Sequence, residues 1–544
     1  MSGNFGNTVR LVRFILRRER FISPVWIASV AFFSAALAPG IEVMFPDAES
    51  KARLLAGYEN PVMTAMMGPL YGAGESTGAM YAGFMLLWTI VAAAVMNIFF
   101  IARHTRADEE RGRAEVVRSL PAGRLANVNA AVLSAVIINA ALAAVTGLGV
   151  FATQTESMDF TGCMLYGAVL GASGLVFAGV AAVFCQLSGS AGGAAGLSFF
   201  TLGAFYLLRA AGDLNAEILS LISPLGLAQR SRVFTGDDAL PAVILLVEAA
   251  ALFLLSFKLN CARDLGRGFI PERPGRSEAG KTLSSPLGLP FRLLRKTAAV
   301  WLAVMFSLGA SYGLVISDIG KFVENSPEYL ALIGVPAEYA KTLSGAEKTE
   351  MLTEYFVAFI NAMMALIALI PLLAAAMKPR AEEKAGRAEH VLARPVSRTK
   401  YLCGFITAAF VLSWLLQCAS ALGLYCAAKA APGAFALSLG ELAAANLVYL
   451  PAVWAVIGAA VFLTGLLPKA AGAIWGYYGF ICFMGLMGGL NLFPDRLEKL
   501  NPMTFVPKLP LEEAKAAPLA VTAAVALALF AVGLISYARR DISA

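Results

Sequence analysis

The sequence predicts an all-α polytopic membrane protein with twelve transmembrane helices, arranged as two parallel six-helix repeats. Hydrophobic residues make up 58% of the chain and charged residues only 15%, whereas a soluble protein has roughly 25% charged residues. Apolar runs of about 20 residues recur, and each is long enough to cross the hydrocarbon core as a helix. A charged stretch at 107–124 reappears at 381–398, about half a chain length later, which indicates an internal duplication.

The spans expected in the first half follow a basic amphipathic segment. Residues 5–20 interleave arginine with apolar residues, which predicts an elbow helix lying in the membrane interface. A short re-entrant or interfacial helix is expected before the sixth span. The six spans are expected at about 22–45, 77–102, 126–151, 162–187, 190–210 and 240–257.

The second half repeats this order. Residues 290–297 (PFRLLRKT) predict a second interfacial elbow helix. A long, acid-rich loop follows the first span in each half. The tripeptide Arg263-Asp264-Leu265 also has a later counterpart in Arg540-Asp541-Ile542. The six spans are expected at about 299–318, 354–377, 401–427, 441–466, 469–490 and 517–537.

A stretch rich in proline, glycine and basic residues separates the halves. The predicted organisation is therefore a first six-span half at 1–257, a cytoplasmic linker at 258–285 and a second six-span half at 286–544.

Arginine and lysine gather on one side of this topology and the acid-rich loops on the other. The positive-inside rule then places both termini, the linker and both charged stretches in the cytoplasm of a multi-pass protein of the cell membrane. The same distribution excludes a nucleic-acid partner as the reason for the net charge of +7. No cleavable signal peptide is expected at the start of the sequence.

The residue types that build metal and disulfide sites are scarce. The seven cysteines include no C-x-x-C pair, which favours small core residues over a disulfide framework. His104 and His390 are the two histidines, so a histidine-based metal or catalytic site is not expected.

The two charged stretches, called here the first charged segment (107–124) and the second charged segment (381–398), share residues at constant spacing. Both have the pattern E-x-x-G-x-x-E followed by P-x-x-R. Glu109 and Arg113 are four residues apart, which supports a helix, and Pro121 and Pro395 end it. A plain cytoplasmic loop would explain the arginines but not the shared spacing. The identical pairs include Glu109/Glu383, Gly112/Gly386, Arg113/Arg387, Glu115/Glu389, Pro121/Pro395 and Arg124/Arg398.

This pattern, placed after the second of six spans, resembles the cytoplasmic coupling segment of type-2 ABC exporter permeases. The duplicated form resembles their twelve-span members, the exporters of polyketide antibiotics and related multidrug permeases. The resemblance implies that the shared residues form coupling helices that dock on a homodimer of ABC nucleotide-binding subunits. It also implies a bacterial cytoplasmic membrane and small hydrophobic or amphipathic cargo. The first segment departs from the pattern in having Ala122-Gly123 where the second has Val396-Ser397.

ATP and Mg²⁺ are expected on the partner subunit, and no cofactor is expected in this chain, which is not itself an enzyme. Residues 275–282 do match the phosphate-loop pattern G-x-x-x-x-G-K-[ST]. That motif requires a buried strand before it and a helix after it. Prolines flank this stretch on both sides, so we interpret the match as chance.

Candidate pathway residues follow from the resemblance, in which the second and fifth spans of each half flank the central path. Glu248 is added as an acid within the sixth span, where an ionisable residue is a functional hypothesis. It either neutralises a cation or carries protons, or it is a hydrogen-bonded or protonated structural group. The candidates are Phe84, Trp88, Phe199, Phe205, Tyr206 and Glu248.

Two other classes of function stay open. A twelve-span proton-coupled secondary drug transporter fits the span count, but intramembrane acids are few and the loops after the first and seventh spans are long. An integral membrane enzyme would need clustered acids or histidines at a membrane face, and Asp237-Asp238 is the one conspicuous pair.

Overall fold

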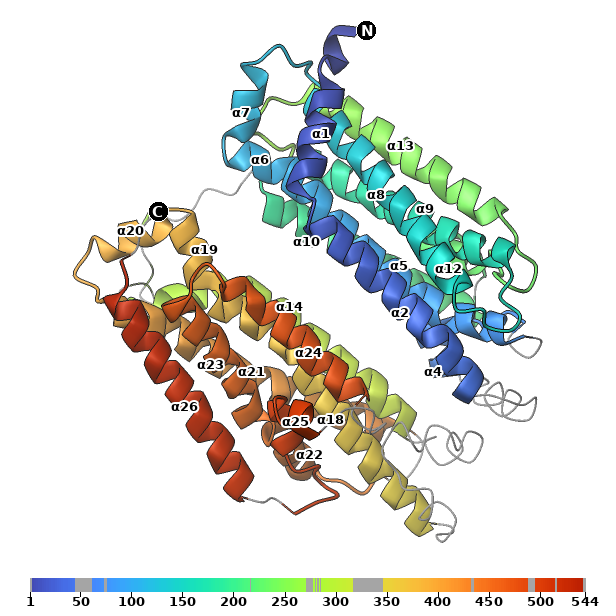
Figure 1. Ribbon diagram of the computed structural model, residues 1–544. Helices are drawn as coiled ribbons and strands as arrows, with labels where there is room; N and C mark the ends of the chain where they lie inside the picture. The colour runs from blue at the N-terminus through green and yellow to red at the C-terminus, as the bar shows by residue number, and fades with distance from the viewer. Residues whose placement is uncertain are drawn as a thin grey trace. The chain divides into compact units, whose positions relative to one another are not determined.

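The computed structural model describes residues 2–44, 61–72, 76–215, 217–270, 277–278, 280, 283, 285–316, 346–431, 435–487, 495–513 and 516–541. All regular structure in these residues is helical (Figure 1). The chain divides into two compact units, Met1–Gly275 and Arg276–Ala544. Most residues of the two acid-rich loops lie outside the described residues. The same is true of most of the stretch at 275–282 that matches the phosphate-loop pattern.

The first unit contains long helices joined by short ones. Its helices are α1 (Thr8–Arg18), α2 (Ile22–Met44), α4 (Pro61–Met67), α5 (Thr77–His104), α6 (Arg106–Glu110), α7 (Arg113–Arg118), α8 (Ala126–Phe151), α9 (Phe160–Leu187), α10 (Ala191–Asn215), α11 (Glu217–Ile222), α12 (Pro224–Gln229) and α13 (Leu240–Ala262).

The second unit has a similar sequence of elements. Its helices are α14 (Gly288–Ile316), α18 (Ala346–Ala376), α19 (Lys378–Lys384), α20 (Arg387–Leu392), α21 (Arg398–Ala430), α22 (Leu439–Leu447), α23 (Leu450–Leu466), α24 (Ile474–Met487), α25 (Asp495–Glu498) and α26 (Ala516–Arg539), with 3-10 turns at Ala471–Ala473 and Pro502–Phe505.

Eleven helices in the described residues are long and apolar enough to cross a membrane. The prediction of an all-α polytopic membrane protein is therefore confirmed. The span expected at 469–490 corresponds to α24, of which 14 residues are described. The fifth span is longer than expected, because α10 continues to Asn215.

The second elbow helix is not separate, so that prediction was wrong. Residues 290–297 form the first turns of the continuous helix α14. In the first unit the chain instead turns between α1 and α2, where the buried Glu19 binds His104. Helix α14 packs closely along α21: a Cβ on Gly309 would lie 2.2 Å from the Ser420 carbonyl oxygen, so this approach requires glycine.

Two other expected boundaries differ from the structure. The tenth span is divided into α22 and α23, because Pro451 has no N–H to continue the helix. The start of the expected linker belongs to the first unit: residues 258–262 are in α13, and the Ile270 N–H donates to the Leu187 carbonyl at 2.8 Å.

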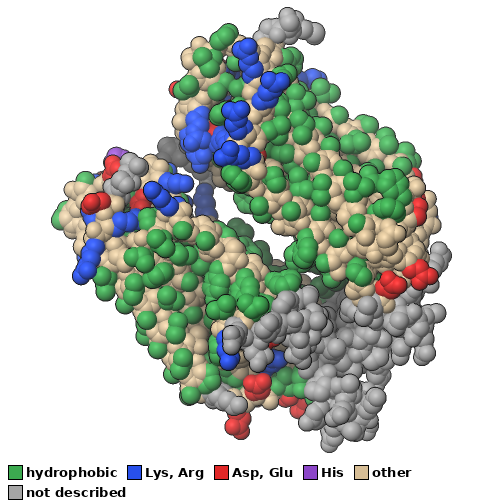
Figure 2. Space-filling model, in the orientation of Figure 1, with side chains coloured by type: hydrophobic (Ala, Val, Ile, Leu, Met, Phe, Trp, Pro, Cys, Tyr) green, Lys and Arg blue, Asp and Glu red, His purple; other side chains and the backbone are tan. Residues whose placement is uncertain are grey.

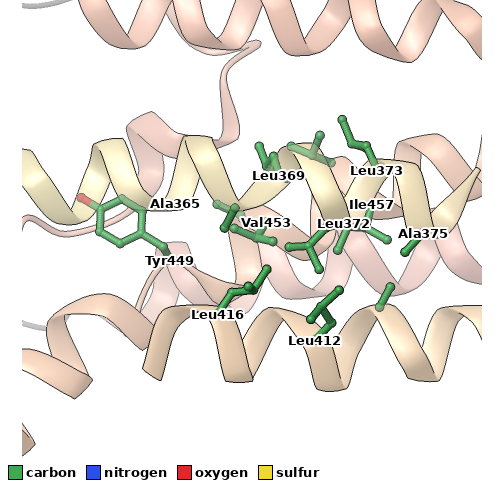
Figure 3. Packing of buried hydrophobic residues seen from close by; sticks show 14 of the residues in the cluster. Ala365, Leu369, Leu372, Leu373, Ala375, Leu412, Leu416, Tyr449, Val453 and Ile457 are labelled. Atoms are coloured by element: carbon green, nitrogen blue, oxygen red, sulfur yellow. The ribbon is translucent and has the colours of Figure 1, made fainter. Parts of the chain in front are cut away.

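Each unit has its own apolar core. In the second unit, Leu369, Leu372 and Leu373 of α18 pack against Leu412 and Leu416 of α21 and against Val453 and Ile457 of α23 (Figure 3). In the first unit α9 is the most buried candidate span. Because helices within a bilayer gain little from hydrophobic burial alone, such tight packing is a main source of their association.

Buried asparagines also join helices. Asn97 of α5 and Asn139 of α8 exchange two amide hydrogen bonds of 3.0 and 2.7 Å, and Asn446 donates to Asn361 at 2.9 Å. The buried Gln417 of α21, by contrast, has no hydrogen-bond partner within the described part of the chain.

The amide pair predicts a stability change that depends on both partners. Asn139→Leu leaves the Asn97 amide buried without its partner, so we expect a loss of about 1–2 kcal/mol in the free energy of unfolding. The double variant N97L/N139L should recover part of this loss. Unfolding in mixed detergent micelles measures both, and N127L, at a half-exposed position of the same helix, is the control. A single variant as stable as the wild type would contradict the assignment.

Candidate functional site

The two charged segments adopt the same backbone conformation. Gly112 lies between α6 and α7 with φ 69° and ψ 2°, and Gly386 lies between α19 and α20 with φ 69° and ψ 0°. The Gly112 N–H donates to the Glu109 carbonyl at 3.0 Å, and the Gly386 N–H to the Glu383 carbonyl at 2.9 Å. This left-handed conformation favours glycine, which explains the shared glycine without reference to a ligand.

The ends of the segments also match. Ala114 of α7 and Ala388 of α20 are the buried residues of these two short helices. A tight turn surrounds each proline, since the Ala122 N–H donates to the Leu120 carbonyl and the Val396 N–H to the Arg394 carbonyl, both at 2.6 Å. Pro121 and Pro395 themselves are exposed.

The shared glutamate that opens each pattern is directed into its unit. Arg263, at the end of α13, donates to both carboxylate oxygens of Glu109 at 2.5 and 2.9 Å, and Arg106 donates at 2.7 Å. The Glu109 side chain is 4% exposed. In the second unit Arg540, which follows α26, donates to Glu383 at 2.5 Å, and the Glu383 side chain is 11% exposed. Each charged segment is thus joined to the end of its unit's last span.

The shared arginine that closes each pattern contacts the same helix end. Arg124 donates to the Arg263 carbonyl at 3.1 Å, and Arg398 donates to the Arg540 carbonyl at 2.5 Å. A cation beside the free carbonyls at a helix C-terminus is electrostatically favourable. The first glutamate and the last arginine of the E-x-x-G-x-x-E…P-x-x-R pattern therefore bind the same residue in each unit, Arg263 in the first and Arg540 in the second.

The helical pairing expected between Glu109 and Arg113 does not form. Arg113 instead pairs with Asp108 at 3.2 Å, and Arg387 pairs with Glu382 at 2.6 Å. The reason is the turn at Gly112, which divides the segment into two short helices and removes the continuous i, i+4 register.

Arg106 extends the ion-pair cluster of the first unit. Its guanidinium donates to the Gly189 carbonyl at 2.7 Å and to the Gly266 carbonyl at 2.8 Å. Gln186 accepts from Arg263 at 2.8 Å. These contacts attach the α9–α10 junction and the chain after α13 to the first charged segment. Sequence reasoning did not select Arg106, Gln186, Arg263 or Arg540, although the repeated Arg-Asp-Leu/Ile tripeptide was a signal for the last two.

The remaining shared glutamates are exposed, and the surfaces around them differ. Glu115 and Glu389 both face away from their units. Beside Glu115 the first segment exposes apolar Val116 (67%) and Leu120 (60%). The corresponding positions in the second segment are His390 and Arg394, which are also exposed.

In the first unit, α1 and the residues before it hold the charged segment at both ends. Arg18 pairs with Asp108 at 2.8 Å. The Asn7 side chain donates to the Pro121 carbonyl at 2.6 Å, and the Gly123 N–H donates to the Gly6 carbonyl at 3.1 Å. The departure of the first segment from the pattern at Gly123 coincides with this contact.

Glu19 anchors the end of α1. It accepts from Arg103 at 2.8 Å and lies 2.7 Å from His104. Burial raises the pKa of Glu19, but the hydrogen bond from His104 and the charge of Arg103 outweigh burial, so its pKa lies below the ordinary value. Glu19 therefore stays ionised at neutral pH.

The candidate pathway residues are dispersed. Phe199 packs on Phe99 of α5 with ring centroids 5.2 Å apart, and Phe205 lies 6.3 Å from Phe177 of α9. Trp88 is exposed, Phe84 is half-buried, and Glu248 is half-buried on α13. None of the six lines the small cavity near Gln229 and Arg232.

Tyr206 belongs to a buried polar cluster that sequence reasoning missed. Arg209 of α10 is fully buried, pairs with Asp213 at 3.2 Å and donates to the Ala65 carbonyl at 2.6 Å. Tyr206 donates to the Met66 carbonyl and Gln229 to the Met67 carbonyl, both at 2.8 Å. Three side chains thus bind successive carbonyls at the C-terminus of α4. Ending the fifth span at residue 210 concealed the pair, although arginine and aspartate four residues apart were visible in the sequence.

The buried ion pairs predict different effects for the two glutamates of each pattern. Glu109→Gln leaves Arg263 without its counter-charge, so we expect a loss of about 3 kcal/mol in the free energy of unfolding. Glu115→Gln, at an exposed site, should change it by less than about 0.5 kcal/mol. Detergent unfolding of the purified variants measures both. Equal stability of the two variants would show that the Glu109–Arg263 pair does not hold the segment.

The chain is similar to known proteins over almost its whole length. The family described as "Multidrug efflux system permease Rv1217c, C-terminal domain" matches residues 14–258 and 283–538. The multidrug efflux system permease protein Rv1217c of Mycobacterium tuberculosis is 34% identical over 548 residues, covering 99% of this chain and 96% of that protein. The chain therefore belongs to the family of multidrug efflux permeases that includes Rv1217c.

Proposed function

We propose that this chain is the membrane-spanning permease of an ATP-driven ABC exporter, in which each charged segment is a coupling segment. The observation that carries the proposal is the repeated contact between a charged segment and the end of its unit's last span. Glu109 and Arg124 bind Arg263, and Glu383 and Arg398 bind Arg540. A force applied to either segment would act directly on a membrane helix.

The proposed complex has twelve spans arranged as two six-span repeats, with both termini and both charged segments in the cytoplasm. A homodimer of ABC nucleotide-binding subunits would bind one segment per subunit and hydrolyse ATP with Mg²⁺. Its closing and opening would bias the permease between inward- and outward-facing states. In the first unit, basic side chains gather at the end that carries α1, α6 and α7, as the positive-inside rule requires for a cytoplasmic side (Figure 2).

Within each segment the residues divide into two roles. Glu109, Arg124, Glu383 and Arg398 transmit force, because their side chains are engaged with the last helix. Glu115 and Glu389 are the contact residues, because they are exposed on the short helices α7 and α20. Gly112 and Gly386 set the angle between the two short helices through their left-handed conformation.

The proposed cargo is a hydrophobic or amphipathic small molecule such as an antibiotic. Membership in a multidrug efflux family supports this class of cargo. Within the first unit, α5 and α10 expose Trp88, Phe200 and Leu207, which offer apolar contact to such a molecule.

A proton-coupled secondary drug transporter is the second candidate. Glu248 favours it, because this half-buried carboxyl on α13 has no ion-pair partner in the described residues. The two candidates differ in their energy source. Drug uptake into inverted vesicles that persists without ATP, and collapses when the proton gradient is dissipated, would select the second candidate.

The proposal predicts that charge reversal at the exposed glutamates uncouples the ATPase. The permease should co-purify with a nucleotide-binding subunit and stimulate its hydrolysis of ATP. E115K/E389K should lower that stimulation at least about tenfold, equivalent to about 1.4 kcal/mol of lost contact energy, while leaving the melting temperature of the permease unchanged.

The matched control is E156K/E512K, which reverses two exposed glutamates outside the charged segments. It should stimulate the ATPase as the wild type does. Normal binding and stimulation by E115K/E389K would overturn the coupling assignment.

A further inference from the structure

Helix α1 has a buried face and a cationic face. Thr8, Val12 and Ile15 are buried, and the helix packs along α8. Arg10, Arg13 and Arg17 are exposed, and their spacing of three and four residues places them on one side of the helix.

The nearby acids are already engaged. Glu19 binds Arg103 and His104, and Asp108 binds Arg18 and Arg113. Within the described residues, Arg10, Arg13 and Arg17 therefore have no acidic partner, and their charges are free to attract an external anion.

Exposed apolar side chains accompany these cations. Phe14 is 60% exposed and lies among the three arginines, and Val9 and Phe21 are exposed at either end of α1. Helix α2, a candidate membrane span, begins at Ile22, immediately after this group. An acidic protein or a nucleic acid would neutralise the arginines but would leave the apolar side chains beside the span exposed to water. An anionic bilayer surface satisfies both.

Helix α1 and the residues before it hold the first charged segment at its beginning and at its end. Arg18 binds Asp108, Asn7 binds the Pro121 carbonyl, and the Leu125 N–H donates to the Asn4 carbonyl at 2.9 Å. In the described residues of the second unit there is no separate helix at the corresponding place, because α14 continues directly into its span. A ligand bound to α1 would therefore act on the first segment alone.

We propose that Arg10, Arg13 and Arg17 form a binding site for anionic phospholipid headgroups, and that lipid bound there fixes the first charged segment against the rest of its unit. This proposal goes beyond the proposed exporter function and does not depend on an ATPase partner.

The test uses the full chain in lipid nanodiscs made from phosphatidylcholine alone or mixed with phosphatidylglycerol. Hydrogen–deuterium exchange is measured at 106–125 and, as an internal control, at 380–398. Phosphatidylglycerol should slow exchange in the first segment and leave the second unchanged. In R10Q/R13Q/R17Q the difference between the two lipids should disappear. Native mass spectrometry should show phosphatidylglycerol binding weakened about fivefold for each arginine removed.

Two variants separate lipid binding from a general loss of charge or fold. R10K/R13K/R17K keeps the cations and should respond to phosphatidylglycerol like the wild type. R292Q/R295Q/K296Q removes three exposed cations at the start of α14 and should leave the response of the first segment intact. The proposal is overturned if wild-type exchange at 106–125 is equal in both lipids, or if the triple glutamine variant of α1 responds like the wild type.

Discussion

The ion pair between each charged segment and the end of the last helix is the constraint on which both units depend. Glu109 and Arg263 are 154 residues apart in the sequence, and Glu383 and Arg540 are 157 apart. Each pair therefore joins the stretch after a unit's second span to the end of its last one. A buried carboxylate and guanidinium lose hydration, which makes their attraction conditional on good geometry and makes the loss of either partner costly. Arg124 and Arg398 reinforce the same junction through backbone carbonyls, so the pattern E-x-x-G-x-x-E…P-x-x-R is in large part a device for holding one helix end.

The two charged segments share a backbone but not their surroundings. The first is held by α1 and the residues before it, and it exposes Val116 and Leu120. The second exposes His390 and Arg394, and among the described residues of its unit no separate elbow helix precedes α14. If the proposed ATPase is a homodimer, two identical surfaces must bind two different segments. Apolar side chains at the centre of an interface contribute more to affinity than exposed charges do. In such a complex the first segment would provide most of the docking energy, and the second would respond more strongly to ionic strength.

Sequence reasoning located the charged segments and most of the spans because both depend on local signals. Apolar length predicts a span, and the identical residues of the two segments are visible by direct comparison. Sequence reasoning did not show that Glu109 and Glu383 are directed inward, because spacing within a segment says nothing of a partner more than 150 residues away. The Arg209–Asp213 pair was missed because the end of a span was assigned where charged residues begin. Here both charged side chains are buried, and α10 continues past them. The division of α22 from α23 was predictable from Pro451. The continuity of α14 was not predictable, because a basic amphipathic sequence is compatible both with a separate elbow helix and with the first turns of a longer helix.

Each charged segment and the end of its unit's last span should move together, and cross-linking tests this most directly. In a background without the seven native cysteines, cysteines placed at Glu109 and Arg263 are joined by a short bismaleimide that replaces the ion pair with a covalent bridge. The measurement is ATP-dependent drug uptake into inverted vesicles that contain the permease and its ATPase. We expect the joined permease to transport at the wild-type rate, because the two elements never separate. Transport that stops on cross-linking, while the uncross-linked double-cysteine permease remains active, would contradict it.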